Sequence, residues 1–450
     1  MPACQHIGRV NLAVRFLVRA RAAADCACDD NVPARYWAVS LMCRRRWVFA
    51  LLSLPIAMSF FLLAASDPAP LVSRDEAILP TSVAAARRLL VSNDPRRLRR
   101  GDERTAVIPA ALIDTAINYF ASRSLRGRAA FILGDDHAEI RLTIRAPGIS
   151  GPRYFNLSAL FQEARGEPRI VAASLGAFPI PSALAEWLIA SAISIAGFSE
   201  EWTIARQAIR RLAFEPARDS VELTYVWEPR LLDRARSMAF TPQDIVHMYA
   251  AQMALAGLLD HYTARARVPL SQILAPLLAP ASDRTLPDNR ATLLVLASYL
   301  AEKNLAMLLP EATGWPRARR VKLTLLGRED SAQHFGISAA LAAWAGEPAA
   351  NAIGVYKEID DSRKGSGFSF ADLAADRAGT RFGELVVDDY PRLYKVLSGT
   401  VTDADLLPSL AGFPEYLSEA EFKRRFGDPN AYSQQTAEIE RRLADLPLYR

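Results

Sequence analysis

Cysteine is absent from this chain beyond residue 43. The four cysteines of the 450-residue sequence are Cys4, Cys26, Cys28 and Cys43. Because the rest of the chain has none, it can hold neither a disulfide framework nor a thiolate metal site. Cys26 and Cys28 have no second pair at zinc spacing, so we predict no metal site there either.

Signatures of several common enzyme classes are also absent. The sequence contains no GxSxG, HExxH, P-loop or GxGxxG pattern, which excludes the hydrolases, zinc proteases and nucleotide-binding enzymes that rely on those motifs. It has no internal repeat and no low-complexity tract. The sequence therefore leaves the question of enzymatic activity open, and we lean towards a protein without one.

A basic domain is missing as well. The net charge of +5 resides in residues 1–46, which carry eight arginines and three aspartates, and basic and acidic residues balance from Trp47 onward. Proteins that bind nucleic acid concentrate positive charge on a domain or a stripe. The only local run, RRLRR at 96–100, is better explained as a solvated flank. We therefore predict no nucleic-acid partner.

One long uncharged run stands near the N-terminus. From Trp47 to Ala65 the chain has about 19 residues without a charge, and three arginines at 44–46 precede it. This length suffices to cross a bilayer, and the arginines place the N-terminus in the cytoplasm. We predict a basic cytoplasmic segment at 1–46 and a transmembrane signal anchor at 47–66 that holds the protein in the inner membrane.

Two features of this segment leave alternatives open. The small residues LAAS at 63–66 also suit cleavage of a signal peptide, but the apolar run exceeds the usual signal-peptide core, which favours a retained anchor. Met42 opens MCRRRW and is a more natural start than Met1. This suggests the hypothesis that residues 1–41 are not translated, which N-terminal peptide mapping would test.

The rest of the chain predicts an α+β fold: after the transmembrane helix, a small antiparallel sheet module and then a mainly α-helical domain. The apolar stretch 181–198 is too short for a second span, so we expect a buried or surface-docked helix. The expected segments are a tether at 67–104, an α+β module at 105–235, a helical domain at 236–390 with a polar motif at 332–384, and exposed C-terminal helices at 391–450.

The polar motif predicts three consecutive helices, at 332–346, 347–362 and 369–384. Gly346 suits the end of the first helix, and the glycine-rich RKGSGF at 363–368 separates the second from the third. Ser369 and Asp372 have the spacing of a capping box at the start of the third helix. An antiparallel arrangement would bring His334, Glu358 and Asp372 to the same level.

Only some of these residues lie on helix faces that are expected to point towards the other helices. His334 shares its face with apolar residues and should point into the core. The stripe formed by Asp372, Asp376, Gly379 and Gly383 on the third helix indicates that another backbone approaches closely. The second helix has its apolar face at Ala352, Val355, Tyr356 and Ile359, and this pattern places Lys357, Glu358 and Asp361 on the opposite side.

Two interpretations of this cluster follow. In one, His334, Glu358, Asp372 and Asp376 are ligands of a divalent metal or acid and base groups, with Lys357 a further catalytic candidate. In the other, they form a structural network: a satisfied core histidine, a Lys357–Asp361 pair, Asp372 capping its helix and Asp376 bonded to a basic neighbour. The second is favoured because paired polar clusters are common in structural networks.

The motif also resembles a known group of proteins. GVYKEIDDSRKGSGFSFADLAADRAGTRFG, preceded by HF-x-x-SAALAA, is similar to the KE-x-x-D…GF-S-x-x-D-x-x-x-D-x-x-G pattern of YfiM-like predicted periplasmic lipoproteins, within a wider set of uncharacterised proteobacterial envelope proteins. The matching residues are His334, Lys357, Glu358, Asp361, Asp372, Asp376 and Gly379. The resemblance covers about 55 residues and implies an envelope location and a helical domain, but no established activity. The anchor and the large N-terminal module depart from that pattern.

Three functions remain open on these grounds. The favoured one is a membrane-anchored periplasmic protein with a non-enzymatic role in envelope binding or assembly, with a lipid or an envelope protein as partner. The second is an envelope hydrolase, metal-dependent or not, that uses His334 with Glu358, Asp372 and Asp376. The third is a subunit of an inner-membrane complex. No cofactor other than a divalent metal is expected.

Overall fold

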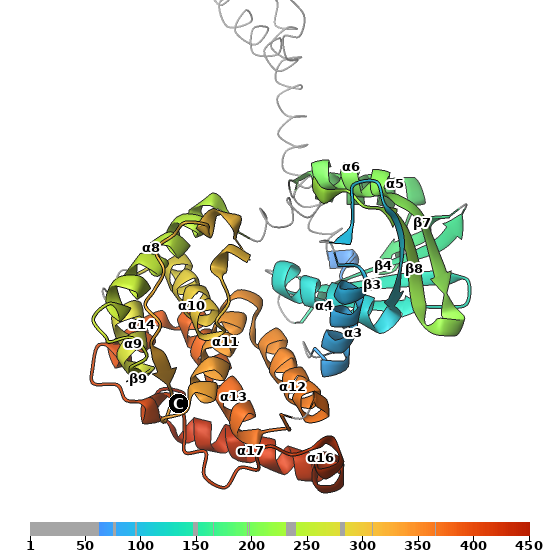
Figure 1. The fold of residues 1–450 in the computed structure, drawn as a ribbon. Helices are drawn as coiled ribbons and strands as arrows, with labels where there is room; N and C mark the ends of the chain where they lie inside the picture. Colours follow the sequence, from blue (N-terminus) through green and yellow to red (C-terminus); the bar gives the residue numbers. More distant parts are fainter. Residues whose placement is uncertain are drawn as a thin grey trace, which may run out of the picture. The chain divides into compact units, whose positions relative to one another are not determined.

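The computed structural model describes residues 63–450, apart from 75–77, 95–96, 147–151, 165, 196, 198, 231–239, 280–283, 308 and 365. The basic segment 1–46 and nearly all of the expected anchor at 47–66 lie outside these residues. Within the described part, no helix is long and apolar enough to cross a bilayer. Residues 67–450 form one compact unit, and their fold class is the predicted mixture of α-helices and antiparallel sheets (Figure 1).

Two antiparallel sheets stand where one was expected. The larger has five strands in chain order, so each strand pairs with its neighbours in sequence, and the smaller has the order β1-β8-β7. The larger sheet consists of β2 (Gly127–Leu133), β3 (His137–Arg145), β4 (Tyr154–Ala164), β5 (Glu167–Leu175) and β6 (Phe178–Ile180). The smaller consists of β1 (Glu103–Pro109), β7 (Ile209–Glu215) and β8 (Ser220–Val226). The helices of this region are α3 (Pro80–Ser92), α4 (Ala110–Leu125), α5 (Ser182–Ile195) and α6 (Ser199–Ala208).

The start of the segment 67–104, expected to be a tether, is bound to the larger sheet. Asp67 and Tyr154 exchange two backbone hydrogen bonds of 2.8 and 2.9 Å. The buried amide of Asn156 donates to the carboxylate of Asp67 at 2.8 Å and to the carbonyl of Ala69 at 2.9 Å, and it accepts from the backbone of Leu71 at 2.9 Å. One buried side chain thus satisfies polar groups that a free linker would present to water. Composition alone could not reveal this.

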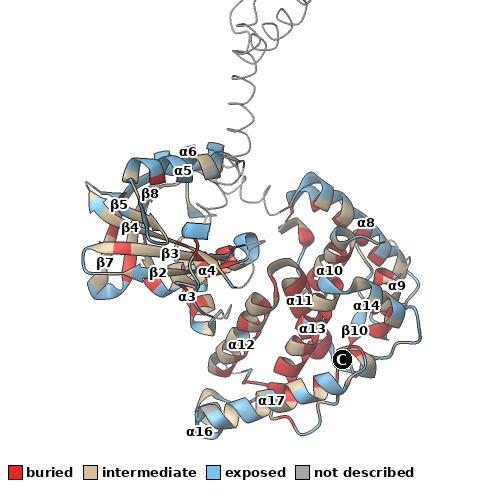
Figure 2. Cartoon of the chain, turned by 180° about the vertical axis from the view of Figure 1, so that it is seen from behind, coloured by how far each residue is buried: buried red, intermediate tan, exposed pale blue. Residues whose placement is uncertain are grey.

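The helical domain is built around α11. This helix packs against α10, α12 and α13, and Figure 2 shows that α11 and α13 are mostly buried. The domain contains α8 (Pro242–Leu259), α9 (Ser271–Leu278), α10 (Leu286–Leu300), α11 (Glu329–Ala345), α12 (Glu347–Lys364), α13 (Phe370–Asp388), α14 (Tyr390–Leu397), α15 (Asp403–Leu406), α16 (Glu419–Phe426) and α17 (Pro429–Asp445), with a short parallel pair of strands, β9 (Arg267–Pro269) and β10 (Lys322–Thr324).

The close approach of a second backbone to α13 is confirmed, and that backbone belongs to α11. A Cβ atom added at Gly379 would lie 2.1 Å from the carbonyl oxygen of Phe335, and one added at Gly383 would lie 2.3 Å from that of Ala339. Both distances are far inside van der Waals contact. Glycine at these two positions therefore sets the distance between α11 and α13.

The C-terminal segment 391–450, expected to form exposed helices, contributes to the core instead. Phe422 of α16 stacks on Phe368 with ring centroids 4.2 Å apart. Ile439 and Leu443 of α17, and Leu448 beyond it, are buried in the same cluster. The charged residues that suggested exposure lie on the outer faces of these amphipathic helices, while the apolar faces cover the domain.

Candidate functional site

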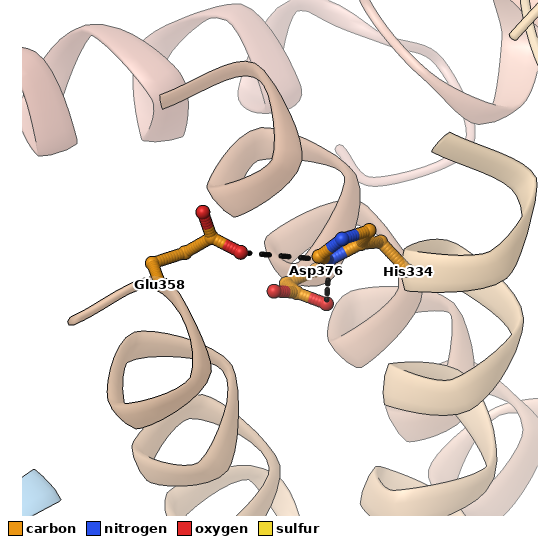
Figure 3. Close-up of side chains that lie close together, drawn as sticks. All are labelled: His334, Glu358 and Asp376. Carbon is orange, nitrogen blue, oxygen red and sulfur yellow. Dashed lines mark ion pairs between the residues drawn. The ribbon is translucent and has the colours of Figure 1, made fainter. Parts of the chain in front are cut away.

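Three buried side chains from three helices meet in the core of the helical domain. His334 of α11, Glu358 of α12 and Asp376 of α13 are 5%, 0% and 5% exposed. Figure 3 shows the imidazole of His334 facing both carboxylates. Its Nδ1 atom lies 3.1 Å from Asp376 Oδ1 and 4.0 Å from Glu358 Oε1. The sequence spacing predicted that His334 and Glu358 would reach the same level, and they do.

The two remaining candidates join this cluster from its more exposed side. Asp372 Oδ2 lies 3.6 Å from His334 Nε2. The ammonium group of Lys357 lies 3.0 Å from the same nitrogen, 3.2 Å from Glu358 Oε1 and 2.7 Å from Asp361 Oδ2. All the residues proposed from the sequence thus belong to a single cluster of charged groups.

Helix α12 is buried on the face its apolar residues predicted, where Ala352 is 3% exposed, and on a second face as well. Its buried stripe runs through Ala350, Gly354 and Glu358, four residues apart. A Cβ atom at Gly354 would lie 2.9 Å from Asp376 Oδ2, so the small residues let α12 approach α13 and carry Glu358 inward. On the apolar side, Arg87 of α3 donates to the hydroxyl of Tyr356 at 2.9 Å. Both sides of α12 are therefore covered.

Only half of the expected capping box forms at the start of α13. The hydroxyl of Ser369 accepts from the backbone of Asp372 at 3.0 Å, as predicted. The backbone N–H of Ser369 donates instead to Glu358 Oε2 at 3.0 Å. The carboxylate of Asp372 is thereby released from a capping role and faces His334 and Arg328.

The sequence analysis missed three contributors. Ser338 is buried and donates to Asp376 Oδ1 at 2.7 Å, and its position four residues after His334 could have identified it. Arg328 lies 3.7 Å from Asp372 and donates to Glu415 at 2.8 Å. Glu415 stands in the connection between α15 and α16, so no local pattern could relate it to this cluster.

The electrostatic environment favours a protonated histidine. Burial lowers the pKa of His334, but the charge of Asp376, the hydrogen bond to it and the charge of Asp372 outweigh burial and raise that pKa to about 9. Lys357 opposes the shift because its ammonium group faces Nε2. That contact is a hydrogen bond only while Nε2 carries no proton. When the ring is protonated, the ammonium group keeps its bonds to Glu358 Oε1 and Asp361 Oδ2.

Burial raises the pKa of the carboxylic acids in the cluster, whereas it lowers that of His334. Loss of solvent raises the pKa of Glu358 to about 7, although Lys357 and His334 favour its charged form. Burial likewise raises the pKa of Asp372. The carboxyl groups and the two basic groups therefore share protons, and the cluster behaves as one coupled unit.

The donor set could in principle hold a cation. One ligand atom each from His334, Glu358 and Asp376 can be chosen so that all lie within 4.8 Å of one another, and one nitrogen with two carboxylates suits a divalent metal such as zinc. Asp376 Oδ2 and Asp372 Oδ1 are buried without a hydrogen-bond partner. The ammonium group of Lys357, however, already contacts two of these three residues.

Access to the cluster is limited. Surface cavities of about 530 to about 770 Å³ open on the described part of the chain. Arg328 lines one of them, but His334 and the charged residues that contact it line none of these four. Asp330 and Gln333 are the lining residues nearest in sequence to His334. A substrate that reached the histidine would have to displace Lys357, whose side chain is 47% exposed.

Comparison with known proteins assigns no family to the chain. No protein-family model matches it, and no curated protein or solved structure matches it either. The resemblance of 332–384 to YfiM-like lipoproteins therefore stays a prediction.

Proposed function

We propose that this protein is a single-pass inner-membrane protein whose residues 67–450 lie in the periplasm and serve binding or assembly in the cell envelope without catalysing a reaction. In this proposal, the charged cluster around His334 fixes the packing of α11, α12 and α13. The anchor rests on the uncharged run 47–65 and the arginines before it.

The position of Lys357 carries the structural assignment of the cluster. Its ammonium group lies within hydrogen-bond distance of His334 Nε2, Glu358 Oε1 and Asp361 Oδ2. The chain thus supplies its own cation at the place where a metal ion or a reacting group would have to sit. A buried carboxylate without such a partner would cost several kcal/mol, on the order of the penalty for an unpaired ion.

Location and topology can be tested together. The full chain is expressed in a Gram-negative host, and membranes are washed with alkaline carbonate before spheroplasts are treated with protease. We expect the protein to stay in the membrane and residues after 66 to be digested from outside. Release by carbonate, or protection of those residues in intact spheroplasts, would contradict the proposal.

An envelope hydrolase remains the second candidate because of two specific atoms. Asp376 Oδ2 and Asp372 Oδ1 are buried without a hydrogen-bond partner, and such atoms are found where a ligand or an ion belongs. His334, with Asp376 facing Nδ1 and a raised pKa that favours the protonated ring, is oriented as a general acid.

Thermal melting distinguishes the two candidates. The full chain in detergent is melted with chelator and with added Zn²⁺, Mg²⁺ or Ca²⁺, beside the Asp376→Asn variant. The structural assignment predicts a less stable variant and no metal response in the wild type. A melting temperature that rises with metal in the wild type only would favour the hydrolase, because a ligand stabilises the state that binds it.

A further inference from the structure

An apolar helix lies on the surface of the sheet-containing region, and few of the residues that the structure describes cover it. Of the α5 side chains that the structure describes, only Ala185 is buried, and Figure 2 shows α5 and α6 as largely exposed. The exposed apolar residues of α5 and of its neighbours in the chain, β6 and α6, form what we call the α5 surface. They are Phe178, Leu184, Trp187, Leu188, Ile189 and Trp202, with Trp187 62% exposed. A cluster of this kind marks an interaction site.

The α5 surface is connected to the point where the chain leaves the expected anchor. Asn156 of β4 donates to the carboxylate of Asp67, only two residues after the end of the uncharged run. The carbonyl of Asn156 accepts from the backbone of Gly176, in the turn between β5 and β6, at 2.7 Å. β6 follows this turn and leads directly into α5. The same end of the larger sheet therefore holds the start of the folded region and the turn that precedes α5.

We infer that the α5 surface inserts into the outer leaflet of the inner membrane and gives the protein a second membrane contact. The inference rests on the proposed function, since it needs the anchor at 47–66. Because Asp67 is fixed to β4 and directly follows the expected anchor, this inference needs no long linker between the anchor and the folded region. Lipid would then cover the apolar residues of α5 without a protein partner.

The composition of α5 specifies the kind of contact. A helix of 14 residues is about 21 Å long, too short for a hydrocarbon core of about 30 Å, so α5 lies in the interface rather than across it. Tryptophan is the residue that favours this depth. Glu186 is the only charged residue of α5, and no lysine or arginine is present. Apolar burial alone therefore drives the contact, and neither anionic lipid nor low salt should strengthen it.

Quenching of tryptophan by brominated acyl chains tests this inference in the full chain. Wild type, Trp187→Phe and Trp315→Phe are reconstituted in lipid nanodiscs with and without brominated phosphatidylcholine. Trp315 serves as the matched control, because it lies in the helical domain and packs edge-on against Tyr249. We expect the quenched fraction of the emission to fall in Trp187→Phe and to rise slightly in Trp315→Phe, which removes an unquenched tryptophan, at every fraction of anionic lipid.

The outcomes separate this inference from the proposed function. If carbonate extracts the wild type from membranes, the anchor fails and both are overturned. If the protein resists carbonate but Trp187→Phe does not lower the quenched fraction, only the contact of α5 with lipid is overturned. A third outcome is that quenching does not fall and each disc holds two copies of the wild type but only one of Trp187→Glu. This result would assign the α5 surface to a second copy of the chain, and it would also overturn the lipid contact.

Discussion

The imidazole of His334 and the carboxylate of Asp376 lie 3.1 Å apart in the core, one on α11 and the other on α13. The same two helices meet three residues further along α13, where Gly379 admits the carbonyl oxygen of Phe335. A charged pair and a backbone contact thus fix the same helix pair at neighbouring positions. Both partners are buried, so removal of either one leaves a buried charge without its counter-ion and destabilises the fold.

Asp376→Asn tests the energetic role of this pair. The substitution keeps the shape of the side chain but removes the charge that faces His334, leaving a buried cation without its nearest counter-ion. We expect the free energy of unfolding to fall by about 3 kcal/mol, measured by chemical denaturation followed through tryptophan fluorescence. Asp361→Asn is the control, because Asp361 pairs with Lys357 near the surface. This substitution should lower the free energy of unfolding by less than about 1 kcal/mol. Equal losses in the two variants would contradict the role of the buried pair.

The sequence contained enough information to assemble this cluster but not to orient all of it. Residue spacing along helices predicted the level of His334, Glu358 and Asp372, and the glycines of α13 predicted a close backbone. Periodicity described α12 only in part: the apolar face is covered, with Ala352 buried, but so is the face that carries Glu358. Both sides of that helix are covered, so the apolar pattern does not identify the side that meets α11 and α13.

Long-range hydrogen bonds were beyond the reach of pattern reasoning. Asn156 is hydrogen-bonded to the segment that starts at Asp67, which lies more than 80 residues earlier in the sequence. Glu415 is hydrogen-bonded to Arg328, which lies 87 residues earlier. Neither residue has a local pattern that distinguishes it from other polar residues in strands or loops. The same limit explains why the C-terminal helices were expected to be exposed: their partners, such as Phe368, lie far away in the sequence.

Substitution of the two glycines of α13 tests the close packing of α11 and α13. Gly379→Ala places a Cβ 2.1 Å from a backbone oxygen, and Gly383→Ala places one 2.3 Å from another. Because the backbone cannot move aside as a side chain can, overpacking in each variant should lower the free energy of unfolding by about 1–3 kcal/mol. Thermal melting of the full chain in detergent would measure the loss.

Gly257→Ala in α8 is the matched control for these variants. No atom lies within 4 Å of a Cβ placed there, so only the helix propensity changes. This substitution should raise the free energy of unfolding by about 0.5–1 kcal/mol. A loss at Gly257 as large as that at Gly379 would show that the glycines of α13 have no special packing role.

The raised pKa of His334 predicts a pH-dependent stability. The folded state binds the proton more tightly than the unfolded state, since the pKa is about 9 against a reference of 6.5. The stabilisation is complete below pH 6.5 and is lost as the pH rises through about 9, with a total of about 3 kcal/mol. Glu358, whose pKa is raised to about 7, acts with the same sign at lower pH, because the folded state again holds the extra proton.

His334→Gln isolates this contribution. Denaturation curves of the wild type and the variant are compared from pH 6 to pH 10, and the stability difference between them is plotted. We expect the advantage of the wild type to shrink as the pH rises above 6.5. His247→Gln, which removes a partly exposed histidine paired with Asp288, controls for general effects of losing an imidazole. A difference that stays constant above pH 6.5 would mean that His334 is neutral in the folded state.

Lys357→Ala tests whether the lysine takes the place of a metal ion. The substitution removes the cation that contacts His334 Nε2 and Glu358 Oε1 but keeps the three residues that could ligate a metal. We expect the variant to be destabilised in chelator and to gain a response to Zn²⁺ that the wild type lacks. At a free zinc concentration 100 times the dissociation constant, the gain should reach about 2.7 kcal/mol.

The double variant Lys357→Ala/Asp376→Asn should lose that gain, because one of the three ligands is gone. Zinc stabilisation of equal size in the wild type and Lys357→Ala would show that the ammonium group and the metal do not compete, and the hydrolase would then become the better-supported function.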